Sequence, residues 1–216
     1  MILRQLQDLL GGIYDVSLAH DVYDFLVTDR GALPAIARRV PSDEQLIVAA
    51  DGDHVGVSLY LDPQLLARLG QANPIRALNQ ANVQDYWTAL EGVSHFVYLA
   101  WNAAHDKPVS LHELELQAEI DKYVASWWVL RAQLPERFPA ELLRLLFERT
   151  RIDPELAAGK VELYRSASRY AEKFCRRIER LLRSAAAHGE REVLAELRRF
   201  YRFSDVRKLA HIERGC

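Results

Sequence analysis

The sequence predicts an α+β protein that is mostly α, a helical bundle with a small antiparallel β module at its N-terminal side. Signals for β-strands occur only in residues 1–75, where two apolar runs flank the turn sequence Asp51-Gly52-Asp53. After residue 76, apolar side chains recur at helical spacing almost to the end of the chain. We therefore expect a small α+β module over 1–75 and a helical bundle over 76–216, packed together as one globular unit.

The N-terminal module is predicted element by element from local patterns. The expected elements are a short helix from Leu3 that stops at Gly11-Gly12, a strand over Asp21–Asp29, one or two helical turns over Leu33–Arg39, hairpin strands Gln45–Ala50 and His54–Leu61, and a helix from Pro63 to Gly70. In the second hairpin strand apolar residues alternate with more polar ones, so one face should be buried and the other wetter. Asp62-Pro63 supplies an N-cap and a first-turn proline for the last helix.

The helices of the bundle follow from apolar periodicity and end signals. We expect them at Asn82–Ala104, from Ser110 to Arg131, at Ala140–Thr150, from Asp153-Pro154 to Gly189, at Glu190–Tyr201 and at Val206–Ile212. Ser110 and Glu113 match a capping box, in which each side chain satisfies the backbone N–H of the other residue. This match favours a helix where Leu114 to Ile120 would otherwise also fit a strand.

Composition bounds the class of protein. A chain of 216 residues, half of them hydrophobic and about a quarter charged, is long enough to bury its own core. The two cysteines form neither a disulfide framework nor a metal quartet, which fits a reducing compartment. The sequence shows neither the pattern of a signal peptide nor a long apolar run. We expect a cytoplasmic protein without a membrane partner.

Charge is divided unevenly along the chain. Residues 165–216 contain 14 Lys and Arg and 7 Asp and Glu, whereas the net charge of the whole chain is −2. Such an asymmetry is typical of a tail that meets nucleic acid, an acidic partner or the acidic half of its own protein.

Two neighbouring helices each carry a polar stripe that points to a site. The candidates for this polar cluster are Glu91, His95 and Tyr98 on the first helix and Glu115, Glu119 and Lys122 on the second. A short loop joins these helices, so they should pair antiparallel and bring the stripes face to face. The stripes then form a metal site, a buried hydrogen-bonded network or a solvated edge of the bundle. Di-iron proteins repeat Glu-x-x-His, and the pattern here is a single Glu-x-x-x-His, so we assign no metal ligand, no catalytic residue and no cofactor.

The long C-terminal helix carries a second candidate surface. The candidates for a basic surface on it are Arg165, Arg169, Lys173, Arg176 and Arg180, with aromatic residues nearby in the sequence. Basic and aromatic residues together are typical of surfaces that bind nucleic acids. Glu172 and Glu179 share this face, however, and can pair with arginines four residues later.

These patterns favour a non-enzymatic interaction or regulatory protein that acts through a protein partner or through self-association as a homo-oligomer. The four tryptophans, Trp87, Trp101, Trp127 and Trp128, indicate more aromatic area than two paired helices easily bury, and aromatic residues are enriched at interfaces. One alternative is an enzyme or ligand sensor that uses the polar cluster. The other is nucleic-acid binding through the basic C-terminal helices.

Overall fold

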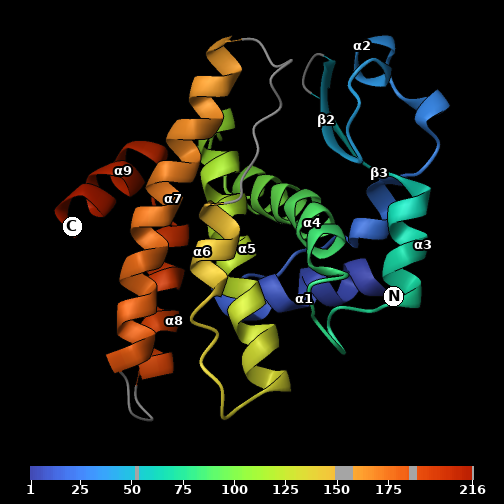
Figure 1. The fold of residues 1–216 in the computed structure, drawn as a ribbon. Coiled ribbons are helices and arrows are strands. Elements are labelled where there is room, and N and C mark those ends of the chain that lie inside the picture. Colours follow the sequence, from blue (N-terminus) through green and yellow to red (C-terminus); the bar gives the residue numbers. More distant parts are fainter. Residues whose placement is uncertain (52–53, 149–157, 185–188, 216) are drawn as a thin grey trace.

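Helices dominate the computed structural model, which describes residues 1–51, 54–148, 158–184 and 189–215 (Figure 1). The N-terminal elements are α1 (Ile2–Tyr14), the 3-10 helix η1 (Val22–Phe25), β1 (Leu26–Val27), the 3-10 helix η2 (Arg30–Ala32), α2 (Ala35–Arg38), β2 (Glu44–Asp51), β3 (His54–Leu61) and α3 (Pro63–Gln71). The later elements are α4 (Val83–Ala103), α5 (Leu111–Gln133), α6 (Leu142–Phe147), α7 (Ala158–Ser184), α8 (Gly189–Tyr201) and α9 (Asp205–Arg214). The predicted α+β, mostly helical class is confirmed.

The sheet is mixed, where the sequence predicted an antiparallel one. Strands lie in the order β1-β3-β2, with β2 antiparallel to β3 and β1 parallel to β3. The pairing of Asp51 with His54 confirms the hairpin, and its turn residues Gly52 and Asp53 lie outside the described part of the chain.

The strand predicted over Asp21–Asp29 is wrong for most of its length. The Asp21 carboxylate accepts a hydrogen bond from the backbone N–H of Tyr23, which starts the 3-10 turn η1. Such side-chain bonds to nearby backbone compete with strand formation, so only Leu26 and Val27 join the sheet.

Helix α1 continues through the glycine pair that was predicted to end it. Ile13 and Tyr14 are both buried, and the ring of Tyr14 stacks on Tyr201 with 4.2 Å between centroids. Burial of these two residues outweighs the cost of glycine in a helix, which is about 1 kcal/mol per residue. The helix instead ends at Asp15, whose φ of 54° is left-handed.

Caps set the start of two other helices. The Asp62 carboxylate accepts hydrogen bonds from the N–H groups of Gln64 and Leu65, as its sequence predicts. At α5 the Ser110 hydroxyl accepts from the Glu113 N–H at 3.0 Å, but the Glu113 side chain does not return the bond. It turns into the core and accepts from Tyr98, so only half of the predicted capping box forms.

The remaining helix ends differ from the prediction by a few residues. Helix α6 covers Leu142–Phe147 where Ala140–Thr150 was expected, and α9 is longer than predicted at both ends. The expected beginning of the long helix at Asp153-Pro154 falls outside the described residues.

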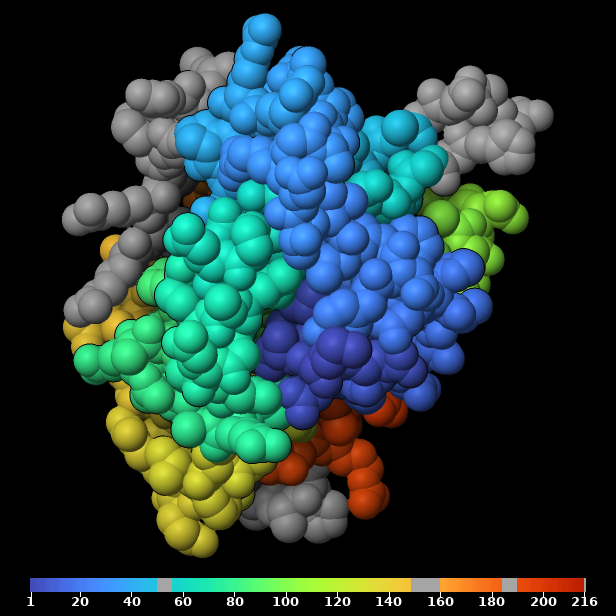
Figure 2. Space-filling model, turned by 90° about the vertical axis from the view of Figure 1, so that its right-hand side faces the viewer, coloured from blue at the N-terminus to red at the C-terminus, as the bar shows by residue number. Residues whose placement is uncertain are grey.

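One hydrophobic core runs through both parts of the chain. It joins apolar side chains of α1, β3 and α3 to those of α4, α5, α7 and α8. The face in Figure 2 is built mainly from the N-terminal segments, and small parts of the C-terminal helices show in orange to red at its margins. Among the described residues, no helix is long and apolar enough to cross a membrane.

Helices α4 and α5 pair antiparallel at the centre of this core. The order of their side-chain contacts demonstrates it, since Trp87 bonds Ser126 and Ser94 bonds Asp121. This pairing confirms the arrangement on which the predicted polar cluster depends.

Candidate functional site: a carboxylate–histidine cluster between α4, α5 and β2

The structure brings five of the six predicted cluster residues together at one place. Helix α4 supplies two of them, helix α5 supplies three, and the first residue of β2 joins them. We call this group the carboxylate–histidine cluster: Glu44, Glu91, His95, Glu115, Glu119 and Lys122. Each helix contributes residues three or four positions apart, which places them on one face of that helix.

Glu44 reaches the cluster because α4 carries a glycine where the sheet packs on it. A Cβ atom at Gly92 would lie 2.8 Å from both Glu44 Cγ and Leu59 Cδ1. Only glycine allows so close an approach, and it costs the helix about 1 kcal/mol relative to alanine. Glu44 was not among the predicted residues of the cluster. A glycine inside a long apolar helix is the signal that would have indicated a close neighbour.

His95 lies between two carboxylates. Its Nδ1 is 3.6 Å from Glu44 Oε1, and its Nε2 is 3.8 Å from Glu115 Oε2. Both His95 Nε2 and Glu44 Oε1 are buried without a hydrogen-bond partner among the described residues. Glu44 Oε1 faces Nδ1, so Nε2 is the ring nitrogen that is left for a ligand, and buried polar atoms rarely stay unpaired.

Lys122 is the internal cation of the cluster. Its ammonium lies 2.5 Å from Glu91 Oε2 and 2.8 Å from Glu119 Oε1. Burial lowers the pKa of Lys122, but the carboxylates of Glu119 and Glu91 outweigh burial and raise it. The lysine therefore stays charged and holds these two glutamates.

Carboxylates outnumber cations in the cluster, and protons compensate the excess. Burial lowers the pKa of His95, but Glu44, Glu115 and Glu91 outweigh it and raise the value to about 9. Burial raises the pKa of Glu115 to about 7, and it also raises the pKa of Glu44. Four glutamates thus share one lysine and one protonated histidine, and the cluster attracts further positive charge.

Three of these residues lie close enough together to be candidate metal ligands, and one of them, Glu91, is also bound by Lys122. One ligand atom each from Glu91, His95 and Glu115 lies within 4.8 Å of the others. Ligands bound at about 2.1 Å from one ion are about 3.0–4.2 Å apart, so a small contraction would complete the site. Because the Glu44 carboxylate faces Nδ1 of His95, Nε2 is the nitrogen left to bind a metal. Carboxylates commonly orient metal-bound histidines in this way.

Tyr98, the sixth candidate, belongs to a different group of residues. Its hydroxyl donates to Glu113 Oε1 at 2.5 Å and accepts from Lys208 Nζ at 2.8 Å. We call the group around it the core network: Tyr14, Ser94, Tyr98, Glu113, Gln117, Asp121 and Lys208. Helical spacing places Asp121 on a different face of α5 from Glu115 and Glu119, and no local sequence pattern predicts this network.

Asp121 is the acceptor at the centre of the core network. It receives hydrogen bonds from Tyr14, from Ser94 at 2.6 Å and from Gln117 at 2.8 Å. Burial raises the pKa of Asp121 to about 6, although these three donors oppose the rise.

The predicted basic surface lies on α7, and acidic residues of the same chain neutralise part of it. Lys173 Nζ is 3.0 Å from Glu213, and Arg176 binds Glu172. Arg165, Arg169 and Arg180 are exposed. Partial neutralisation weakens the attraction that this face would have for a nucleic-acid backbone.

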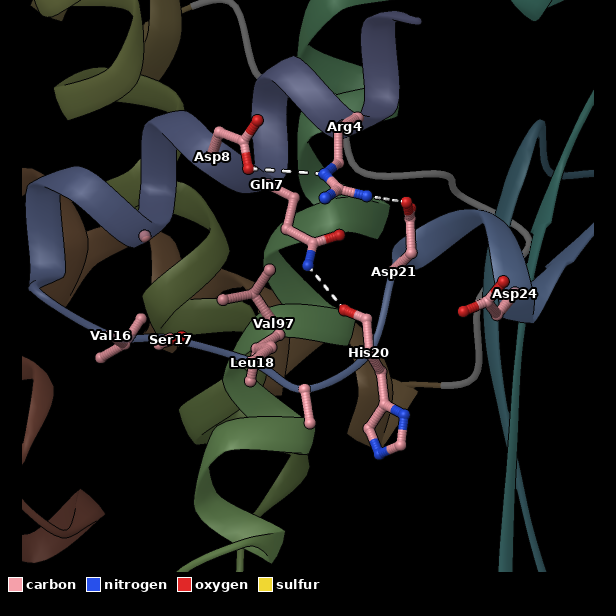
Figure 3. A pocket seen from close by; sticks show the side chains of 12 residues that line it. Arg4, Gln7, Asp8, Val16, Ser17, Leu18, His20, Asp21, Asp24 and Val97 are labelled. Atoms are coloured by element: carbon pink, nitrogen blue, oxygen red, sulfur yellow. Dashed lines mark hydrogen bonds and ion pairs between the residues drawn. The ribbon is translucent and has the colours of Figure 1, made fainter.

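A separate surface pocket of about 460 Å³ lies between α1 and residues 16–24 (Figure 3). Arg4 bridges Asp8 and Asp21 across it, and the Gln7 amide donates to the carbonyl of His20. Because these polar groups satisfy one another, the pocket offers less to a ligand than the cluster does.

Comparison with protein-family models, with curated proteins and with solved structures gives no match.

Proposed function

We propose that this protein binds one divalent transition-metal ion through Glu91, His95 and Glu115, and serves as a metal-dependent enzyme or ligand sensor. The observation that carries this proposal is the Nε2 of His95, which is buried, faces Glu115 and has no hydrogen-bond partner within the described ranges of the chain. One imidazole and two carboxylates are a donor set suited to Zn²⁺, Mn²⁺, Fe²⁺ or Co²⁺.

Three protein ligands leave a coordination position open. Catalytic zinc sites use three protein ligands and a bound water, whereas structural sites use four. A bound ion would act as a Lewis acid on a small ligand at this position. Burial, together with the nearby carboxylates of Glu115 and Glu91, raises the pKa of Tyr164 in α7 to about 12. Tyr164 is therefore the candidate to contact such a ligand.

Calorimetric titration of chelator-treated protein with Zn²⁺, Mn²⁺ and Co²⁺ tests the proposal. We expect one equivalent to bind, and His95→Ala to weaken binding by at least about tenfold, since it removes a ligand. Glu115→Gln should have a similar effect because it keeps the shape of the side chain and removes the charge.

The matched control is His105→Ala. His105 follows α4 and is exposed, and its ring contacts the carbonyl of Trp101 rather than any carboxylate. Equal binding by wild type and both histidine variants would contradict the proposal, as would wild type that takes up no ion.

Association with a protein partner or a second copy stays a prediction. Three of the four tryptophans are less than 10% exposed within the chain itself, so they supply less support for an interface than their number suggested. Sedimentation analysis checks self-association, and binding to nucleic acid should be checked by its dependence on salt.

A further inference from the structure

Helix α9 inserts one lysine into the interior of the helical bundle. Lys208 is completely buried, and its ammonium donates to Tyr98 Oη and to Gln117 Oε1, each at 2.8 Å. Glu113 Oε1 lies 3.8 Å away and balances the charge. We call this surrounding the ammonium socket.

Aromatic rings complete the socket. The Lys208 ammonium lies 4.2 Å from the ring centre of Tyr98, 5.2 Å from that of Phe200 and 5.9 Å from that of Tyr201. Aromatic faces attract cations at such distances, and cages of this kind recognise ammonium ligands. Two acceptors at hydrogen-bond distance also require N–H donors, which favours a primary ammonium over a quaternary one.

The socket is held together without the help of α9. Tyr98 donates to Glu113, and Gln117 donates to Asp121, which also accepts from Ser94 and Tyr14. All these residues belong to α1, α4 and α5. The hydrogen bonds that link the polar groups of the socket to one another therefore do not involve α9.

Helix α9 buries few of its side chains completely. Only Lys208 and Ile212 of its ten residues are buried, and Val206 is 77% exposed. Its other contacts are polar pairs such as Asp205 with Ser110 and Glu213 with Lys173, together with those of Leu209 and His211. Leu209 packs against the core, and His211 lies 2.5 Å from Glu196 with its ring beside Phe200 and Phe203. An element with few buried apolar contacts opens at a lower free energy than the core. Burial also lowers the pKa of Lys208 to about 8, so the inserted ammonium opposes its own burial.

We infer that the socket is a binding site for primary alkylammonium groups and that α9 is a latch that occupies it with Lys208. The natural ligand is then a free amine or a lysine side chain of a partner protein. This inference is independent of the metal proposal, because no residue of the socket belongs to the carboxylate–histidine cluster.

Cavity rescue in the full-length chain tests the socket. Lys208→Ala removes three methylene groups and the ammonium, a volume that n-propylammonium matches. We expect n-propylammonium to raise the Tm of this variant in a saturable way, and n-propanol and tetramethylammonium to leave it unchanged. Equal effects of all three probes, or no effect of n-propylammonium, would overturn the inference.

Two controls make the rescue specific. Wild type and Lys208→Met, in which the socket stays filled, should not respond to n-propylammonium. Arg207→Ala removes a charge from the exposed side of the same helix and should not respond either. A response by these proteins equal to that of Lys208→Ala would show a general salt effect and count against the site.

Hydrogen exchange of the wild-type protein tests the latch without any variant. We expect the amides of Asp205–Arg214 to exchange through an opening that leaves α4 and α5 protected. Equal protection of α9 and α5 would overturn the latch, whether or not Lys208→Ala folds.

The same measurement on Lys208→Ala distinguishes the sources of the ligand. Rescue by n-propylammonium with α9 still protected indicates a free amine that fills the cavity. Binding of a lysine-containing peptide with α9 deprotected indicates a partner that displaces the helix, and failure of both probes rejects the socket.

Discussion

Gly92 is the residue that allows the sheet and α4 to share one site. Its missing side chain lets Leu59 and Glu44 approach the helix backbone, and Glu44 then meets His95. A single residue without a Cβ thus connects the packing of β2 and β3 to the charge balance of the cluster.

Gly92→Ala should destabilise the protein and weaken metal binding. The new methyl group would be 2.8 Å from two side chains, one of which, Leu59, is completely buried. Overpacking costs about 1–3 kcal/mol, which exceeds the helix propensity of about 1 kcal/mol that alanine restores. Urea denaturation measures the net loss, and titration calorimetry should record an affinity lowered by about tenfold or more, since Glu44 orients His95.

Gly12→Ala is the matched control. Gly12 also lies inside a helix, but a Cβ there would meet nothing within 4 Å. The free energy of unfolding of this variant should be about 0.5–1 kcal/mol higher than that of the wild type, and its metal affinity should be unchanged. An equal change of stability in both variants would contradict the role given to Gly92.

At the scale of elements, the N-terminus of α5 depends on one side chain. The Ser110 hydroxyl accepts from the Glu113 N–H, and Glu113 is thereby placed beside Tyr98 in the core network. The cap therefore supports both the helix and the ammonium socket.

Ser110→Ala should lower the free energy of unfolding by about 1 kcal/mol, because one N–H at the helix start loses its partner. Ser204 provides the comparison, since it occupies the N-cap of α9 without a side-chain cap bond. We expect Ser204→Ala to change stability by less than about 0.5 kcal/mol in the same denaturation experiment. A cost for Ser204→Ala equal to that for Ser110→Ala would mean that the hydroxyl bond is not what stabilises α5.

Elements whose cause is local could be predicted from the sequence. The apolar period of α4 and the Ser110 cap are patterns within a few residues, and both helices formed as expected. The same reasoning failed for Asp21–Asp29, where a side-chain bond to nearby backbone competed with strand propensity, and for Gly11-Gly12, where burial of Tyr14 against α8 decided the helix end.

The site was predictable only where its partners are near in sequence. Glu91 and His95, or Glu119 and Lys122, are neighbours on one helix face, so helical spacing indicates them. Lys208 contacts Tyr98 and Gln117, which are 110 and 91 residues away in the sequence, and no local pattern predicts such contacts.

At the scale of the whole molecule, the polar groups form two separate buried systems. In the carboxylate–histidine cluster the neighbouring carboxylates outweigh the effect of burial, so the pKa of His95 lies above its ordinary value. In the core network burial outweighs the effect of the acidic neighbours of Lys208, so the pKa of Lys208 lies below its ordinary value. His95 and Lys208 therefore affect stability with opposite signs as pH rises.

The contribution of His95 favours the folded state at low pH. Its pKa of about 9 exceeds the ordinary value of 6.5, so the folded state binds the proton more tightly. This contribution is complete below about pH 6.5 and is lost as pH rises through about 9.

The contribution of Lys208 has the opposite sign and is the one to measure. Between about pH 8 and pH 10.5 the unfolded chain holds a proton that the folded state has released. Stability therefore rises with pH over this window, by up to about 3 kcal/mol at 1.36 kcal/mol per pH unit. Urea denaturation at several pH values between 7.5 and 10.5 measures this effect. The free energy of unfolding of the wild type should rise with pH relative to that of Lys208→Met, which lacks the titrating group. Because both proteins keep His95, the difference between them isolates Lys208, and a difference that stays constant or shrinks with pH would show that Glu113 and Tyr98 hold the proton against burial.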